Sequence, residues 1–321
     1  MKMNSTKLMF MTILLLSTLM VVSSNNILMS WMAMEMNLFM FLPLMTKKKK
    51  MKDQPMKYFI IQSLSSSTML MSILMNSNSE IPLSTSILLM TSMLMKMGMM
   101  PFHLWMPMIM NKLSWNKCFL LSTWQKIAPV NILSQLTEFK LLMLPMCVSL
   151  ILAPISAIKQ LSMKKIMAYS SISNTPWMIT SMMISKTLFS IFMFTYSIIT
   201  FMMMKTMKNM NLNFINQMMT STNLQKMNLI VLTLSISGMP PTTGFLPKWL
   251  ILNQLINLSE TISVSMITSS IISTFLYMKM SKNFMTSMNL KKKIKKKSKK
   301  LKYIIPFNML GFPLIMILKS S

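Results

Sequence analysis

Four ionisable side chains lie inside or at the ends of long apolar stretches, where buried charge is costly and usually serves a function. They are Glu35 in SWMAMEMNLFM, Lys96 in TSMLMKMGMMPFHLWMP, Lys126 in FLLSTWQKIAPVNIL and Lys248 in SISGMPPTTGFLPKWLILNQ. In apolar surroundings a carboxyl or an amine stays charged only beside an opposite charge or water, so its protonation follows its surroundings. The pattern predicts a site that handles charge or protons.

Each of these residues also has a structural interpretation. Glu35 could be a neutral carboxyl that hydrogen-bonds to a neighbouring helix. Lys96, near the end of its stretch, could extend its amine to the membrane surface, whereas both ends of the stretch around Lys126 are distant. Buried charges can also persist as packing pairs, so the sequence alone leaves a structural role open.

Glycine and proline interrupt the stretches that carry these lysines. Pro129 follows Lys126 and removes a backbone donor, and five Gly and Pro residues fall within 238–247. Irregular backbone at membrane depth is tolerated only where protein or a water-filled cavity satisfies it. The segments 96–107 and 238–249 both combine Gly, Pro, an aromatic residue and Lys, which favours antiporter-like inverted repeats with discontinuous helices.

The remaining candidates for chemistry are few. His103 is the only histidine, and its imidazole could gate proton access near neutral pH, although an oriented structural histidine explains it equally well. Cys118 and Cys147 lack metal-ligand spacing, and the chain has no Gly-rich phosphate loop. We therefore expect this chain to bind no metal or cofactor.

The apolar stretches are long enough to cross a membrane, for which a helix needs about 20 mostly apolar residues. Only 12% of residues are charged, against about 25% in soluble domains. We predict an all-α polytopic membrane protein, a single transmembrane domain over 1–321 with about eleven transmembrane helices. The expected segments are 8–24, 27–45, 58–75, 81–99, 116–136, 141–158, 166–185, 187–204, 227–256, 261–278 and 303–318.

Basic residues gather in every second loop. There are 33 of them, all lysine, against 5 acidic residues. The positive-inside rule puts these loops on one side, with the N-terminus, and an odd number of crossings puts the C-terminus opposite. The basic loop 279–302 carries nine lysines in 291–302 and could bind anionic phospholipid such as cardiolipin.

The net charge of +28 does not indicate a nucleic-acid partner. The lysines alternate with membrane segments, and the chain lacks arginine, whose planar fork grips phosphate. The 49 methionines, with an excess of Lys, Ile, Asn and Phe, are typical of an AT-rich organellar genome.

Several segments together resemble one known family. They are SWMAMEMNLFMFLPL at 30–44, KMGMMPFHLWMP at 96–107, LSTWQKIAPV at 121–130, MAYSSIS at 167–173 and SGMPPTTGFLPKWLI at 237–251. Their order and spacing are similar to those of the chain 2 family of respiratory complex I, which is related to cation/proton antiporters. Beyond about residue 251 the resemblance is one of hydropathy only.

The resemblance implies a core subunit of complex I in the mitochondrial inner membrane, with the basic side and N-terminus in the matrix and the C-terminus in the intermembrane space. It implies proton translocation coupled to electron transfer from NADH to ubiquinone, with FMN, iron–sulfur clusters and ubiquinone bound by other subunits. By resemblance, Glu35 pairs with Lys96, Lys126 is the central relay and Lys248 the terminal proton carrier.

One position departs from the family. Asn174 stands where relatives often have histidine, and an amide cannot titrate. If that histidine is a relay, water or a hydroxyl of Ser170, Ser171 or Ser173 must replace it here.

Two other functions remain open at this stage. An Mrp-type sodium/proton antiporter subunit would use the same buried residues. A structural membrane subunit without a proton path would retain them as packing pairs.

Overall fold

The described part of the chain is helical throughout in the computed structural model, which describes residues 5–46, 53–78, 82–215, 217 and 223–286. Those residues form thirteen α-helices. Within the same ranges no strand is present, and the one β-type pairing is an isolated bridge between Ser162 and Phe214. The predicted all-α class is confirmed.

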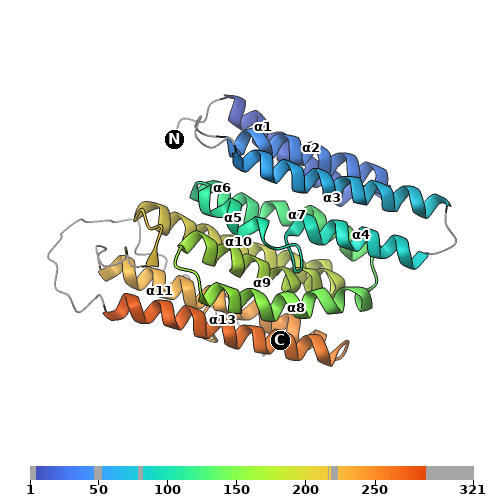
Figure 1. Ribbon diagram of the computed structural model, residues 1–321. Helices are drawn as coiled ribbons and strands as arrows, with labels where there is room; N and C mark the ends of the chain where they lie inside the picture. The colour runs from blue at the N-terminus through green and yellow to red at the C-terminus, as the bar shows by residue number, and fades with distance from the viewer. Residues whose placement is uncertain (1–4, 47–52, 79–81, 216, 218–222, 287–321) are drawn as a thin grey trace. The chain divides into compact units, whose positions relative to one another are not determined.

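The chain divides into two compact units, Met1–Met146 and Cys147–Ser321, which are described separately. In the first unit α2 packs between α1 and α3, and α3 packs on α4 and α5. Helix α7 packs against α1, α4 and α6. The first-unit helices in Figure 1 are α1 (Ser5–Ser23), α2 (Ile27–Met45), α3 (Asp53–Asn78), α4 (Pro82–Met97), α5 (Trp105–Lys112), α6 (Trp115–Ser122) and α7 (Trp124–Leu136).

The second unit is built around α9, with α8 leading into it from the first unit. Helix α9 packs against α10, α12 and α13, while α11 packs against α10 and α13. The helices are α8 (Phe139–Ile158), α9 (Met163–Ile184), α10 (Lys186–Asn209), α11 (Asn223–Ser237), α12 (Phe245–Leu255) and α13 (Glu260–Thr286).

Many serine and threonine hydroxyls inside these apolar helices bond within their own helix. Ser65 donates to the carbonyl oxygen of Gln62 at 2.7 Å, and Ser92 donates to that of Leu89 at 2.6 Å. Such bonds to a carbonyl three residues earlier let serine and threonine occupy helices without exposing a polar group to lipid.

Six helical segments in the described ranges are long and apolar enough to cross a membrane, and Thr85–Met97 is a shorter apolar helix. Large apolar side chains stay exposed on these helices, among them Leu144 and Phe194. A helix that is apolar on its outer face as well as its inner face suits a lipid environment. The six are Ser5–Ser23, Ile27–Met45, Asp53–Met75, Phe139–Ile158, Lys186–Asn209 and Glu260–Lys282.

The structure refines the expected segments. Segment 227–256 is broken as predicted, into α11 and α12, whereas 116–136 is divided into α6 and α7 around Thr123. Helix α13 continues to Thr286, so the first part of the basic stretch 279–302 is helical and not a loop. Its remainder and the expected helix 303–318 lie outside the described residues, and the count of eleven stays a prediction.

Candidate functional site

The break between α11 and α12 creates the binding site for the Lys248 amine. Helix α11 ends at Gly238, whose φ of 82° suits glycine. The Met239 amide donates to the carbonyl oxygen of Leu234 at 3.2 Å, which closes the helix in a Schellman motif. The last two carbonyl oxygens of α11, those of Ile236 and Ser237, then have no backbone donor within the helix.

Lys248 occupies this helix end from the first turn of α12. Its Nζ donates to the carbonyl oxygens of Ser237 at 2.9 Å and Ile236 at 3.3 Å. The C-terminus of a helix carries partial negative charge, so it favours an ammonium group. The Nζ also lies 5.4 Å from the centre of the Trp177 ring, within the range of a cation–π contact.

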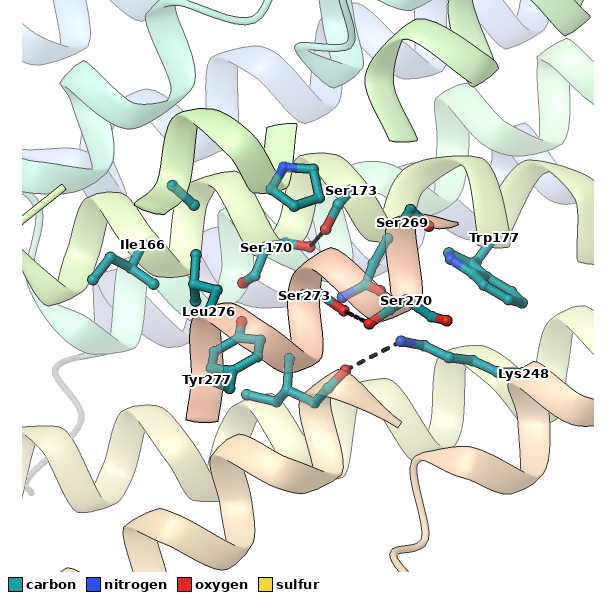
Figure 2. A pocket seen from close by; sticks show the side chains of 14 residues that line it. Ile166, Ser170, Ser173, Trp177, Lys248, Ser269, Ser270, Ser273, Leu276 and Tyr277 are labelled. Carbon is teal, nitrogen blue, oxygen red and sulfur yellow. Dashed lines mark hydrogen bonds between the residues drawn. The ribbon is translucent and has the colours of Figure 1, made fainter. Parts of the chain in front are cut away.

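A cavity in the second unit lies beside Lys248, between polar faces of α9 and α13 (Figure 2). The volume in which the centre of a water molecule can lie is about 20 Å³. A cavity that holds one water needs roughly 10–15 Å³ of such volume. The cavity can therefore hold water in contact with the lysine. Its lining is Pro154, Ala157, Ile166, Ser170, Ser173, Asn174, Trp177, Ile236, Lys248, Ser269, Ser270, Ser273, Leu276 and Tyr277.

The end of α4 in the first unit has the same backbone form. Gly98 has a φ of 67°, and the Met99 amide donates to the carbonyl oxygen of Leu94 at 3.0 Å. Here the Trp105 indole bonds a carbonyl of the last turn, that of Met95, at 3.2 Å. Both helices thus end in the same backbone motif. The side chain that bonds the carbonyl oxygens of the last turn is Lys248 in one unit and Trp105 in the other.

Lys96 lies in the last turn of α4, beside a second cavity with about 20 Å³ of space for the centre of a water molecule. Around it, Gln125 Nε2 donates to Asn37 Oδ1 at 2.8 Å, and Gln62 Nε2 donates to the carbonyl oxygen of Lys96 at 3.3 Å. The cavity is lined by Met34, Asn37, Leu38, Tyr58, Gln62, Lys96, Gln125, Ala128 and Pro129.

Glu35 on α2 is the acidic residue that acts electrostatically on Lys96. The side chain is half-buried. Its Oε1 atom is buried and has no hydrogen-bond partner among the described residues. A buried carboxyl oxygen without a hydrogen-bond donor carries a cost in free energy.

Lys126 is 2% exposed and lies in the first turn of α7. We expected a helix break at Pro129, but α7 continues through Pro129 and the irregularity precedes the lysine, at Thr123. The Thr123 hydroxyl donates to the carbonyl oxygen of Phe119 at 2.7 Å, which satisfies the end of α6. Pro129 instead lines the Lys96 cavity.

The accessory residues have separate positions. Ser170, Ser173 and Asn174 line the Lys248 cavity, whereas Ser171 is fully buried outside its lining and donates to the carbonyl oxygen of Ala168 at 2.7 Å. His103 lies in the loop between α4 and α5, with Nδ1 3.3 Å from the carbonyl oxygen of Pro101. It lines neither cavity.

Sequence reasoning missed several polar residues of both cavities. It singled out buried charges, the one histidine and the polar residues of 170–174, so the amides of Asn37, Gln62 and Gln125 and the phenol of Tyr277 were passed over. The available signal was a polar side chain within an otherwise apolar stretch. Among the described residues no group of three His, Cys, Asp or Glu side chains could hold a metal ion.

Lys96 and Lys248 each lie at a helix end beside a small polar cavity, an arrangement that suits an antiporter-like membrane subunit. Residues 24–274 match the family model described as NADH:quinone oxidoreductase/Mrp antiporter, TM. Within that group, the chain belongs to the NADH-ubiquinone oxidoreductase chain 2 family. It is 38% identical to that chain of Locusta migratoria, covering 87% of this chain and 85% of the relative. The Anopheles gambiae chain is 35% identical, covering 85% and 84%.

Solved structures share the fold at much lower identity. A chain of respiratory complex I from Thermus thermophilus superposes with a TM-score of 0.80 at 17% identity, covering 98% of this chain and 78% of that chain. A chain of the Mrp complex from a Dietzia species gives 0.73 at 12% identity, covering 90% and 62%.

Proposed function

We propose that the chain is a core membrane subunit of respiratory complex I and takes part in proton translocation across the mitochondrial inner membrane. Electron transfer from NADH to ubiquinone in other subunits supplies the energy, and this chain transmits it without a redox centre of its own. The observation that carries the proposal is a Lys248 amine held at a helix break, beside a polar cavity with room for water.

The buried charges suggest how this chain's residues act. The carboxylate of Glu35 stabilises the ammonium form of Lys96, so separating the two releases a proton from the lysine. Moving one charge against the membrane potential requires about 2.3 kcal/mol per 100 mV. The free energy gained or lost when one buried lysine changes its partners is of that size. A modest rearrangement is therefore sufficient to transfer one proton.

The finer features of the proposal follow from the sequence. They are about eleven crossings with antiporter-like inverted repeats, the N-terminus in the matrix and the C-terminus in the intermembrane space. FMN, iron–sulfur clusters and ubiquinone belong to the partner subunits, and anionic phospholipid, including cardiolipin, binds the basic stretch 279–302.

A native gel of inner membranes, stained for NADH oxidation, tests membership of the complex. We expect mass spectrometry to find this chain in the large active band. A chain that migrates alone or in a small assembly would contradict the proposal.

Replacing Lys126 tests the relay. We expect Lys126→Met to lower the ratio of protons translocated to NADH oxidised in an assembled complex, because methionine fills the same buried space without carrying a proton. Lys186→Met is the matched control, since Lys186 is exposed at the start of α10. An unchanged ratio in Lys126→Met removes Lys126 from the path.

A sodium/proton antiporter subunit is the second candidate, favoured by the fold shared with the Mrp complex. It predicts a sodium-dependent pH change in vesicles that receive no NADH. We expect no such change if the chain acts within complex I.

A further inference from the structure

Helix α13 presents a polar stripe to the Lys248 cavity. Ser269, Ser273 and Tyr277 all line it, and their spacing of four residues places them on one face of the helix. At 1.5 Å per residue, the stripe extends about 12 Å along α13. In Figure 2 the stripe begins beside Lys248 and continues to Tyr277. Further along α13 in the same direction come Lys279 and Lys282.

Helix α9 supplies the facing stripe. Ser170, Ser173, Asn174 and Trp177 line the same cavity. Ser170 lies three and four residues before the adjacent pair Ser173 and Asn174, and Trp177 lies three residues after Asn174, so all four share one face of the helix. Small polar residues also let membrane helices pack closely, but here the two stripes line a cavity with room for water, so the space between them can be hydrated.

The serine hydroxyls on both stripes can serve the cavity only as acceptors. Ser170 donates to the carbonyl oxygen of Met167 at 2.9 Å, Ser269 to that of Met266 at 2.8 Å, and Ser273 to that of Ser270 at 2.8 Å. A hydroxyl whose hydrogen is engaged still has a lone pair to accept a hydrogen bond. The cavity therefore needs donors.

Two donors face it. An ammonium group has three N–H bonds, and Lys248 uses two on the α11 carbonyls, which leaves one for the cavity. The second donor is Tyr277, which is 2% exposed. Its hydroxyl lies toward the side chain of Ser170 (Figure 2), with which it interacts, although it makes no hydrogen bond of ordinary distance and angle within the described residues.

We propose that Tyr277 is a relay residue that passes protons between the Lys248 cavity and the lysine-bearing end of α13. The inference rests on the proposed function. Water at the lysine-bearing end of α13, which the proposed topology puts on the matrix side, gives a proton to the Tyr277 oxygen as the phenolic proton passes to water in the cavity. That water then protonates the neutral amine of Lys248. One proton enters and one leaves the phenol, so Tyr277 stays neutral overall. Asn174, on the facing stripe, cannot do this because an amide does not titrate.

Tyr277→Phe in the intact complex tests this role, because it removes the hydroxyl and keeps the ring. Tyr169→Phe is the matched control, since Tyr169 is a buried tyrosine of α9 outside the cavity lining. Lys248→Met gives the reference for a blocked path. In each variant, NADH oxidation by uncoupled membranes and the ratio of protons translocated to NADH oxidised are measured.

We expect Tyr277→Phe to lower the proton ratio by at least about half of the fall in Lys248→Met, with uncoupled NADH oxidation unchanged. A structural role would instead lower assembly and oxidation, and leave the ratio of the remaining complex intact. A normal ratio in Tyr277→Phe beside a lowered one in Lys248→Met overturns the inference and leaves the proposed function standing. A normal ratio in Lys248→Met overturns both, and an equal fall in Tyr169→Phe also overturns the inference.

Discussion

Two buried lysines of this chain obtain their partners by different means. Lys248 bonds the carbonyl oxygens at the end of α11, whereas Lys96 has the carboxyl group of Glu35 as its electrostatic partner. Backbone carbonyls are fixed in place, while a carboxyl side chain can rotate or take up a proton. The stabilisation of Lys96 is therefore the more adjustable of the two.

The amide pair beside Lys96 gives a residue-scale prediction. Gln125→Leu leaves the buried Oδ1 of Asn37 without its donor at 2.8 Å, which should destabilise the first unit by about 1–3 kcal/mol. We expect a lower melting temperature for the release of this chain from the purified complex.

A double variant provides the control for that experiment. Asn37→Leu with Gln125→Leu removes both polar groups and should recover part of the lost stability. If the losses of the two single variants simply add, the two amides do not interact as described.

At the scale of elements, the helix ends determine where charge can be placed. Gly98 and Gly238 both adopt positive φ and close their helices in the same way, which makes free carbonyls available inside an apolar protein. Lys96 precedes its glycine on the same helix, whereas Lys248 returns to its glycine from the following helix. The same helix-ending motif therefore has its lysine within the ending helix in the first unit, and on the following helix in the second unit.

Substitution of the glycines tests these helix ends. In Gly238→Ala, the new Cβ would lie 2.9 Å from Lys248 Cδ, and the φ of 82° disfavours a side chain by roughly 1–2 kcal/mol. Because the lysine side chain can move, we expect an assembled complex with a lowered ratio of protons translocated to NADH oxidised.

Gly244→Ala should be far more severe. Its Cβ would meet the backbone carbonyl oxygen of Ser235, and backbone of a packed helix cannot move aside cheaply. We expect loss of the chain from the assembled complex on native gels. A normal yield of complex would show that α11 and α12 separate more easily than their packing indicates.

At the scale of the whole molecule, several exposed lysines of the second unit lie at or near the ends of its helices. In the second unit the Met163 amide donates to the carbonyl oxygen of Asn213 at 2.9 Å, and the Ile215 amide donates to that of Leu161 at 3.2 Å. The loop before α9 and the segment after α10 therefore meet at one end of this unit. Lys159, Lys205 and Lys208 lie near that end, whereas Lys186 begins α10 at the other.

The proposed orientation predicts which lysines each side of the membrane can reach. A membrane-impermeant amine reagent should modify Lys159, Lys205 and Lys208 in inside-out inner-membrane vesicles, and Lys186 in mitoplasts. These side chains are exposed in the isolated chain. Modification of Lys186 together with Lys205 from the same side would refute the topology.

The sequence determined the class of the protein because its signals are local. Apolar length predicted helices, and Gly and Pro predicted the break within 238–247. Charge inside apolar stretches made Glu35, Lys96, Lys126 and Lys248 the candidate residues. The motifs around them indicated the family to which the chain belongs.

The tertiary structure alone decided which groups meet. The break near Lys126 falls at Thr123 and not at Pro129, because the hydrogen bonds of α7 continue past the proline. Only packing brings Ser170 of α9 and Tyr277 of α13 to one cavity with Lys248, since residues about a hundred positions apart leave no local pattern of their contact.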